Sequence, residues 1–152
     1  MTTLSWDEYF VNIAQTVKAK SKDRSTQVGA VIVGIHKNIL STGFNGFPIG
    51  VREDEEWRHE RPVKYQFTEH AERNAIYLAA RHGTSLNGAT LYLPIGGLPC
   101  TDCARACIQA GIRKIVTPTN KFDGKGKDWE EDAKISQLML HEAGVEIVIL
   151  DA

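Results

Sequence analysis

Two stretches decide the fold of this chain: His70-Ala71-Glu72 and Pro99-Cys100-Thr101-Asp102-Cys103. The first offers an imidazole nitrogen and, two residues later, a carboxylate. The second offers two thiols at C-x-x-C spacing, directly after a proline. Each stretch opens a segment with helical periodicity, so we expect two helix starts that face one another across a common centre.

Together the two stretches indicate a metal centre. A tetrahedral Zn²⁺ held by His70, Cys100 and Cys103 keeps its fourth position for water and lowers the pKa of that water towards about 7. Glu72 then stands where it can accept the water's proton and deliver it to a nitrogen. Inside a helix, side chains two residues apart project about 200° from each other, so His70 and Glu72 reach one centre only at a helix start. A lone C-x-x-C would also fit a redox pair, but the combination is hard to explain by packing.

The composition favours one globular domain. The chain has 152 residues, of which 42% are hydrophobic, so we predict a single domain over residues 1–152. The net charge of -1 argues against nucleic acid as a partner but allows a small anionic substrate. Three Cys do not make a disulfide framework. No stretch resembles a signal peptide or a membrane span, so we expect a cytoplasmic protein without a membrane partner.

Hydrophobic periodicity predicts an alternation of helices and strands. Helices are expected over residues 6–20, 70–82, 100–110 and 129–143, and strands over 27–35, 39–42, 89–93, 114–117 and 145–150. Ser5 and Glu8 form a capping box before the first helix, and Thr68 or Glu69 is expected to cap the second. This order implies a mixed central sheet with helices on both faces.

The polar segments between these elements carry further candidate residues. Residues 18–26 are either a plain solvated loop or a phosphate site in which Arg24 acts with Ser25 or Thr26. Asn45 either adopts a left-handed turn conformation or reaches a sugar hydroxyl with its amide. Residues 51–67 have mixed charge and no apolar period, which is more typical of a lid or an interface than of a connector. Residues 120–127 are expected to form a loop containing Gly and Lys.

With these motifs placed, the chain resembles the cytidine and deoxycytidylate deaminase superfamily over nearly its whole length, and most of all the dCMP deaminases. H-x-E followed by P-C-x-x-C is the signature of zinc-dependent nucleobase deaminases. The further stretches that carry the resemblance are Val28-Gly29-Ala30-Val31-Ile32-Val33, Thr42-Gly43-Phe44-Asn45-Gly46-Phe47-Pro48, His70-Ala71-Glu72-Arg73-Asn74-Ala75-Ile76, Cys103-Ala104 and Gln109-Ala110-Gly111-Ile112.

This resemblance implies a three-layer α/β/α cytidine-deaminase-like fold with a mixed five-stranded sheet. It implies hydrolytic deamination of dCMP to dUMP and ammonia, which supplies dUMP for dTMP synthesis. One Zn²⁺ per subunit would be bound by His70, Cys100 and Cys103. Glu72 would deprotonate the zinc-bound water, protonate N3 of the cytosine and pass the proton on to the departing amino group. Asn45 would approach the sugar, and backbone groups of Ala71 and Cys100 would hold the edge of the base.

The resemblance also implies a homo-oligomer, a hexamer or a dimer, whose subunits share the substrate pockets. Arg24 with Ser25 or Thr26 is the first expectation for the phosphate contacts, and the cations of residues 58–64 are the second. dCTP and dTTP are candidate effectors, and the long segment after Asn45 is where we expect them to act.

Two features depart from the family pattern. Residues 93–99 form a longer link to Cys100 than the short, hydroxyl-bearing link of the family, and this link borders the base. Residues 45–70 lack the additional Cys that some phage and eukaryotic dCMP deaminases use for another zinc. The first departure leaves the substrate open, and the second is the reason to expect a single zinc.

Other functions share the same zinc motif. A deaminase of cytidine, deoxycytidine, guanine or a modified nucleotide is the strongest alternative. A tRNA adenosine deaminase is disfavoured, because binding tRNA requires many phosphate contacts and the chain has no basic excess. A catalytically silent zinc protein for assembly is disfavoured by Glu72, because a structural zinc site normally closes its fourth position with a protein ligand.

Overall fold

A computed structural model describes residues 2–95, 97–119 and 127–151, with the side chains of 127–129 left out. The predicted loop over residues 120–127 therefore lies almost wholly outside the described residues. The strands are β1 (Gly29–Val33), β2 (Ile39–Phe44), β3 (Thr90–Tyr92), β4 (Lys114–Thr117) and β5 (Glu146–Ile149). The helices are α1 (Trp6–Lys18), α2 (Lys64–Phe67), α3 (Ala71–Arg81), α4 (Thr101–Ala110) and α5 (Lys127–Glu142), with a short 3₁₀ turn η1 (Glu56–His59).

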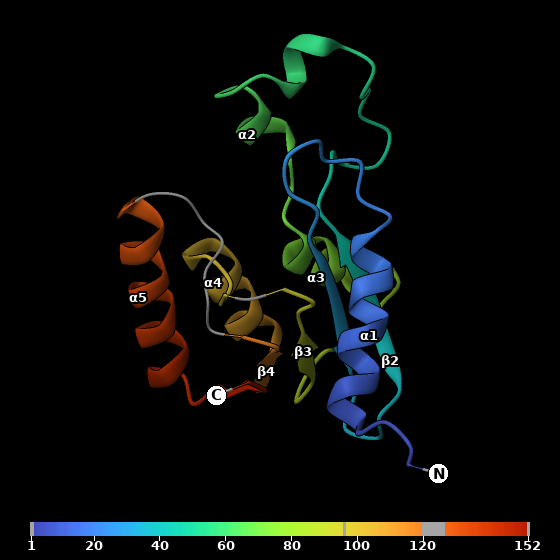
Figure 1. Cartoon of the computed structure of the whole chain (residues 1–152), viewed down its shortest axis with the longest axis vertical. Coiled ribbons are helices and arrows are strands. Elements are labelled where there is room, and N and C mark those ends of the chain that lie inside the picture. Colours follow the sequence, from blue (N-terminus) through green and yellow to red (C-terminus); the bar gives the residue numbers. More distant parts are fainter. Residues whose placement is uncertain (1, 96, 120–126, 152) are drawn as a thin grey trace.

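The strands form one mixed sheet in the order β2-β1-β3-β4-β5 (Figure 1). β1 runs antiparallel to both β2 and β3, and Val31 lies between Thr42 and Tyr92. β3, β4 and β5 are parallel, with helical connections between them. The mixed five-stranded sheet predicted from the order of elements is confirmed.

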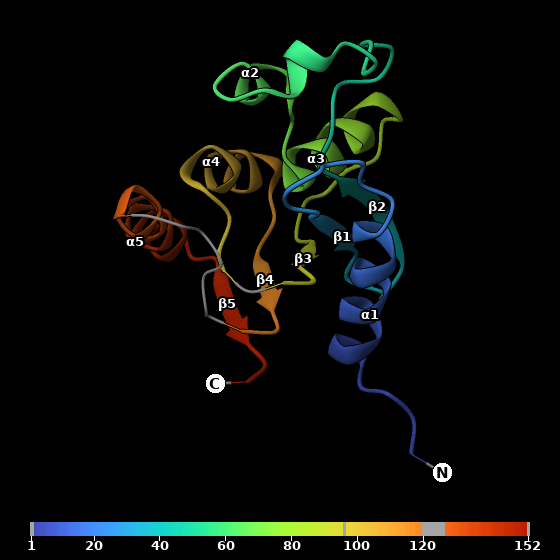
Figure 2. The ribbon, with the colours of Figure 1, turned by 45° about the horizontal axis from the view of Figure 1, so that its top comes forward.

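Helices cover both faces of this sheet, which gives three layers (Figure 2). Side chains of successive residues in a strand point to opposite faces, so β1 contributes to two separate cores. Ala30 and Ile32 belong to the core beneath α3, α4 and α5. Val31 and Val33 belong to the core beneath α1, together with Phe10 and Tyr92. All five residues of β1 are buried, which explains why its sequence is a continuous apolar run rather than an alternation.

The close approach of α3 to β2 depends on a glycine. A Cβ atom added to Gly43 would lie 2.4 Å from the carbonyl oxygen of Ala71 and 2.4 Å from the nitrogen of Ala75. Neither atom can move without shifting the helix, because both belong to its backbone. Gly43 therefore allows the first turn of α3, which carries the residues of the metal motif, to lie directly on the sheet.

Most predicted elements are confirmed, with boundaries that differ by at most two residues. The first strand begins at Gly29 rather than at residue 27, because the N–H of Val28 donates to the Asn45 side chain instead of to a neighbouring strand. β2 continues to Phe44, two residues beyond the expected end. The predicted irregular segment 51–67 contains the two short helical turns η1 and α2. Among the helices of the described residues, none is long and apolar enough to cross a membrane.

The predicted cap of α3 is wrong. His70, not Thr68 or Glu69, occupies the N-cap position, and its extended backbone has φ -77° and ψ 151°. Its side chain makes no capping hydrogen bond, since the imidazole lies against two cysteines instead. Glu69 supports this turn in another way, because its carboxylate accepts a hydrogen bond from the N–H of His70 at 3.0 Å.

Candidate active site

The first part of the site lies at the start of α3. His70 precedes the helix, and Ala71 and Glu72 are its first two residues. Ala71 is fully buried and Glu72 is only 6% exposed. The first N–H groups of a helix have no partner within it, so the N–H of Ala71 has no partner inside α3. A carboxylate therefore lies below the surface, next to an imidazole and a helix start.

The second part of the site lies at the start of α4. Cys100 is the N-cap of this helix, and its sulfur accepts a hydrogen bond from the N–H of Cys103 at 3.5 Å. Cys103 is one turn further on and is fully buried. The helix ends at Gly111, whose φ of 90° is the left-handed conformation that glycine readily adopts. This helix matches its prediction, apart from Cys100 standing at the cap.

The two helix starts bring three metal-ligand atoms together, one each from His70, Cys100 and Cys103, all within 4.8 Å of one another. Nδ1 of His70 lies 3.4 Å from Sγ of Cys100 and 3.5 Å from Sγ of Cys103. In a tetrahedral zinc site, bond lengths of about 2.0 Å to nitrogen and 2.3 Å to sulfur place the two kinds of ligand atom about 3.5 Å apart. The donor types and their separations thus fit Zn²⁺ with a fourth position left open.

The three ligand side chains also shift one another's pKa values. Hydrogen bonds from Cys103 and His70 lower the pKa of the Cys100 thiol to about 4 despite its burial. The same contact with Cys100, together with burial, raises the pKa of Cys103. The hydrogen bond with Cys100 raises the pKa of His70. These shifts favour one thiolate and oppose a second, and a divalent cation would stabilise both.

Glu72 has its pKa raised by burial, against the opposing effect of a hydrogen bond from Cys103. A carboxyl group with a raised pKa is suited to taking up and releasing protons near neutral pH.

Cys107 lies one turn beyond Cys103 and is fully buried, as expected for a small hydrophobic side chain. Burial raises the pKa of its thiol, and the group of possible metal ligands among the described residues consists of His70, Cys100 and Cys103 without Cys107.

An ion-pair chain that the sequence analysis missed connects the two helix starts. Arg73 contacts the carboxylate of Glu69 at 2.6 Å and that of Asp102 on α4 at 3.5 Å. Arg73 is largely buried, with 19% of its side chain exposed. The i,i+4 spacing of Glu69 and Arg73 was a signal for the first pair. The second pair joins separate helices and has no signal in the sequence.

Asn45, a candidate sugar contact, is tied to the backbone of the preceding loop. Its side-chain oxygen accepts from the N–H of Val28 at 2.8 Å, and its amide nitrogen donates to the carbonyl of Thr26 at 2.8 Å. It is 7% exposed. Among the described residues other than glycine, Lys37 alone has a positive φ, so the left-handed interpretation of Asn45 is wrong. Its amide instead holds residues 26–28 in place.

The loop that carries Arg24, Ser25 and Thr26 is organised around Asp23. Oδ1 of Asp23 accepts from the N–H groups of Ser25 and Thr26, each at 2.9 Å, and from Nζ of Lys64 at 3.0 Å. Lys64 also donates to Oγ of Ser25 at 2.7 Å. This buried anchor was missed, because it joins residues 41 positions apart.

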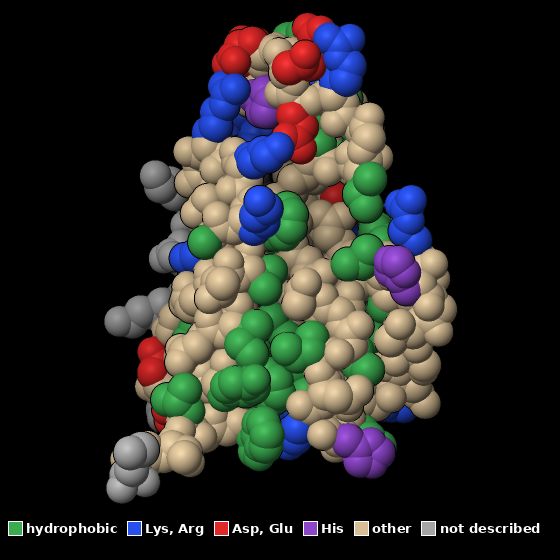
Figure 3. Space-filling view, turned by 90° about the vertical axis from the view of Figure 1, so that its right-hand side faces the viewer, with side chains coloured by type: hydrophobic (Ala, Val, Ile, Leu, Met, Phe, Trp, Pro, Cys, Tyr) green, Lys and Arg blue, Asp and Glu red, His purple; other side chains and the backbone are tan. Residues whose placement is uncertain are grey.

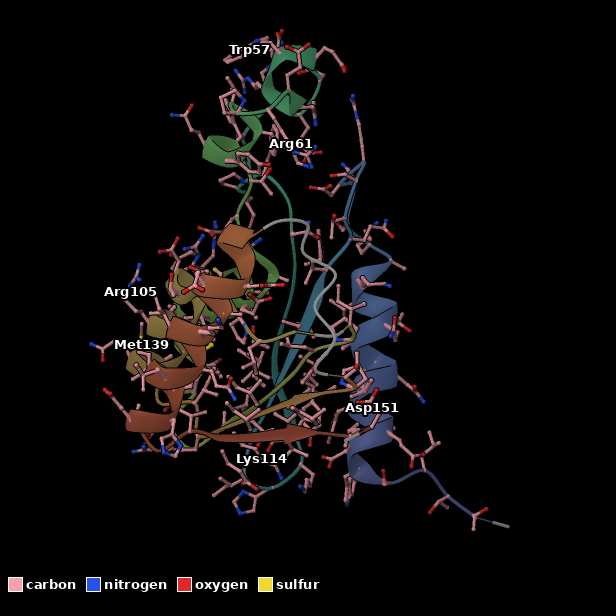
Figure 4. All side chains as sticks on the ribbon, turned by 60° about the vertical axis from the view of Figure 1, so that its left-hand side comes forward. Trp57, Arg61, Arg105, Lys114, Met139 and Asp151 are labelled. Atoms are coloured by element: carbon pink, nitrogen blue, oxygen red, sulfur yellow. The ribbon has the colours of Figure 1, made fainter. Side chains whose placement is uncertain are left out.

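Arg24 itself is exposed and forms an ion pair with Glu56 at 2.7 Å. Arg61 adds a further cation nearby, since it donates to Ser25 at 3.3 Å. Figure 3 shows basic and acidic side chains gathered at the end of the molecule that carries η1 and α2, and Figure 4 labels Trp57 and Arg61 there. The structure therefore brings the two predicted groups of phosphate-binding cations, residue 24 and residues 58–64, to one end of the fold.

Residues 4–119 match the model of the cytidine and deoxycytidylate deaminase zinc-binding region. The chain belongs to the cytidine and deoxycytidylate deaminase family. This deaminase is 42% identical over 95% of its length to an uncharacterized deaminase of Aliivibrio fischeri, of which it covers 93%. It is 34% identical to human deoxycytidylate deaminase, with 93% of the chain and 78% of the human protein aligned.

Solved structures agree with this membership. The deaminase superposes on the dCMP deaminase of cyanophage S-TIM5 in its apo form with a TM-score of 0.73 at 26% identity, covering 97% of this chain and 99% of the phage chain. The structure of the same phage enzyme in complex with dCMP and dUMP gives a TM-score of 0.74 at 26% identity. The expected cytidine-deaminase-like fold is thereby confirmed, and the chain is a hydrolytic deaminase.

Proposed function

We propose that this deaminase converts dCMP and water to dUMP and ammonia, and so supplies dUMP for dTMP synthesis. The observation that carries the proposal is the buried carboxylate of Glu72 beside three metal-ligand atoms that lie within 4.8 Å of one another. Relatives that bear the name deoxycytidylate deaminase support the choice of substrate, since the human protein is 34% identical over 93% of this chain.

His70, Cys100 and Cys103 would hold one Zn²⁺ per subunit. When bound, the ion supplies a Lewis acid that lowers the pKa of a coordinated water towards about 7. The three protein ligands leave one tetrahedral position open, which is the arrangement of a catalytic rather than a structural zinc. The chain's own contribution is to hold these ligands at two rigid helix starts, where little motion is needed before reaction.

Glu72 would carry the protons of the reaction. Its carboxylate accepts a proton from the attacking water and delivers it to N3 of the cytosine ring, which makes C4 more electrophilic. A second proton then passes through Glu72 to the amino nitrogen as the C4–N bond breaks. Water supplies the oxygen at C4 and two protons, of which one stays on N3 and the other joins the departing amino group to give ammonia, so atoms balance. The burial of Glu72 keeps bulk water from competing for these protons.

The nucleotide would lie between the metal site and the loop of residues 23–26. We propose that backbone groups at Ala71 and Cys100 hold the edge of the base, and that Asn45 contacts the sugar. Arg24, with Ser25 or Thr26, would contact the phosphate. The ion pair between Arg24 and Glu56 is exposed to solvent, where such pairs are weak, so the guanidinium is free to turn to a phosphate.

The assembly and its regulation complete the proposal. Ile49, Trp57 and Tyr65 are more than half exposed in the segment between β2 and α3, a surface that suits contact with further copies of the chain. We propose a cytoplasmic homo-oligomer, and we propose this same segment as the place where dCTP and dTTP act.

Ammonia release is the direct test. The zinc-loaded enzyme is assayed with dCMP, deoxycytidine, cytidine, CMP and guanine, with and without dCTP. We expect a strong preference for dCMP. Higher activity on a nucleoside or on guanine would keep the deaminase chemistry and overturn the substrate, and no ammonia from any of the five would overturn both.

A further inference from the structure

Two side chains of α5 bind the residues directly before and after Cys100. Oγ of Ser136 donates to the carbonyl of Pro99, the residue before Cys100, at 2.5 Å. The carboxylate of Asp132 accepts from the residue after Cys100, at 3.0 Å from the N–H of Thr101 and at 2.8 Å from its hydroxyl. Asp132 and Ser136 are one helical turn apart, so both project from one side of α5.

These two side chains, which we call the α5 clamp, are not explained by packing alone. Ser136 is fully buried in a helix. Ser and Asp are poor helix formers, and an apolar side chain would fill a buried helix position at lower cost. Figure 4 shows α5 alongside α4, near Arg105 and Met139, where apolar contacts already join the two helices. Apolar burial alone would hold α5 against α4. The two polar side chains in addition fix the position of α5 relative to the turn of Cys100.

The clamp acts where the metal geometry is most sensitive to the backbone. Cys100 is the N-cap of α4, so its side-chain position follows directly from the backbone conformation of Pro99, Cys100 and Thr101. The 3.4 Å separation of its sulfur from Nδ1 of His70 is close to the tetrahedral value. Releasing either anchor would let this turn move away from His70, whereas Cys103 is held within the helix.

We propose that Asp132 and Ser136 are positioning residues for the metal ligand Cys100. This inference rests on the proposed zinc site. The clamp touches neither the metal nor the substrate. It restricts the turn of Cys100 before the ion arrives, so that binding does not have to order it, and it holds the sulfur in place afterwards.

The test compares Ser136→Ala and Asp132→Asn with a matched control, Ser41→Ala. Ser41 is also buried, and its hydroxyl donates to the carbonyl of Ala75 at 2.6 Å, a similar bond that involves no neighbour of a cysteine ligand. For each protein, the zinc dissociation constant is measured by competition with a chromophoric chelator. The absorption spectrum of the Co²⁺-substituted protein reports ligand geometry, and thermal unfolding reports stability.

We expect each clamp variant to bind zinc about tenfold more weakly than the wild type and to change the Co²⁺ spectrum. Ser41→Ala should lose stability but keep the zinc affinity and the spectrum. Unchanged affinity and spectrum in both clamp variants would overturn the inference while the proposed function stands. A wild type that binds no zinc would overturn the proposed function, and the inference with it. If Ser136→Ala does not fold, Asp132→Asn decides alone. This variant should fold, because its amide oxygen can still accept one of the two hydrogen bonds from Thr101.

Discussion

Nδ1 of His70 lies 3.4 Å from Sγ of Cys100, although 30 positions of sequence separate the two residues. β3 and the segments on either side of it lie between them along the chain, and they carry the second helix start back to the first. This short distance brings the ligand atoms of two separate motifs together in one site. The predictions below test the residues that form the site and those that support it.

The two buried thiols of α4 should differ sharply in function. Cys103→Ser is expected to lose bound zinc and activity, because serine replaces a ligand atom. Cys107→Ala should keep both and lose about 1 kcal/mol of stability, because it only shortens a buried side chain. Zinc content by elemental analysis and ammonia release measure the difference. Equal zinc loss in both variants would contradict the assignment of Cys103.

Removing the metal should destabilise the folded chain as well as stop turnover. A ligand that binds only the native state at about 100 times its dissociation constant adds about 2.7 kcal/mol of stability. Dialysis against a chelator should therefore lower the melting temperature, and added Zn²⁺ should restore it. Calorimetry of the apo and reloaded protein measures this shift. Identical melting temperatures would show that the three ligands do not hold the ion.

Glu72→Gln should reduce kcat by a factor of about 10²–10⁴ while the zinc content stays unchanged. The amide has nearly the same shape as the carboxylate but cannot carry a proton. Glu142→Gln, at the exposed end of α5, is the control and should behave as the wild type. Near-normal turnover of Glu72→Gln would exclude Glu72 as the proton carrier.

Arg24→Ala should raise KM for dCMP about tenfold and leave KM for deoxycytidine nearly unchanged. The side chain would contact only the phosphate, which the nucleoside lacks. Arg81→Ala, at the exposed end of α3, removes one positive charge elsewhere and controls for net charge. Steady-state kinetics with both substrates measure the split, and an equal effect on the two would refute the phosphate contact.

Asp23 should make stability depend on pH. Burial raises the pKa of this carboxyl, but hydrogen bonds from the N–H groups of Thr26 and Ser25 and from Lys64 lower it overall. A lowered pKa in the folded state adds stability above the unfolded value of about 3.9, and this stability is lost as the pH falls through the folded pKa. Asp23→Asn should therefore be less stable than the wild type by about 1–3 kcal/mol near neutrality.

Urea titrations between pH 3 and pH 7 measure this difference, which should shrink below about pH 4. Asp54→Asn is the control, because the Asp54 side chain is 73% exposed, and it should stay close to the wild type throughout. A pH-independent difference for Asp23→Asn would mean that the charge on Asp23 does not stabilise the loop.

Gly43→Ala should damage both the fold and the metal site. The added methyl group would lie 2.4 Å from backbone atoms of α3, and we expect a loss of about 1–3 kcal/mol together with weaker zinc binding. Gly46→Ala, where a Cβ would meet no atom within 4 Å, is the matched control. Urea unfolding and chelator competition measure the two effects. A Gly43→Ala protein with normal stability and zinc affinity would contradict the close contact.

Local patterns in the sequence determined the elements and the donor atoms. The N-cap at Ser5, the helical periodicity behind it and the glycine at residue 111 depend on neighbours within a few positions, and all are present in the structure. The types and spacing of His70, Cys100 and Cys103 were likewise sufficient to indicate zinc, because a metal selects its ligands by atom type and geometry. The order of elements was enough to predict a mixed sheet between two layers of helices.

Tertiary structure alone decided how these pieces support one another. Hydrogen bonds from Asp132 and Ser136 to the turn of Cys100 depend on how α5 packs against α4. The anchoring of Asp23 by Lys64 joins residues 41 positions apart. The side chain of Asn45 holds the backbone of the preceding loop through Val28 and Thr26, a role that the sequence did not indicate. Periodicity and spacing report only what lies within a few residues, whereas each of these contacts forms only after separate elements have packed.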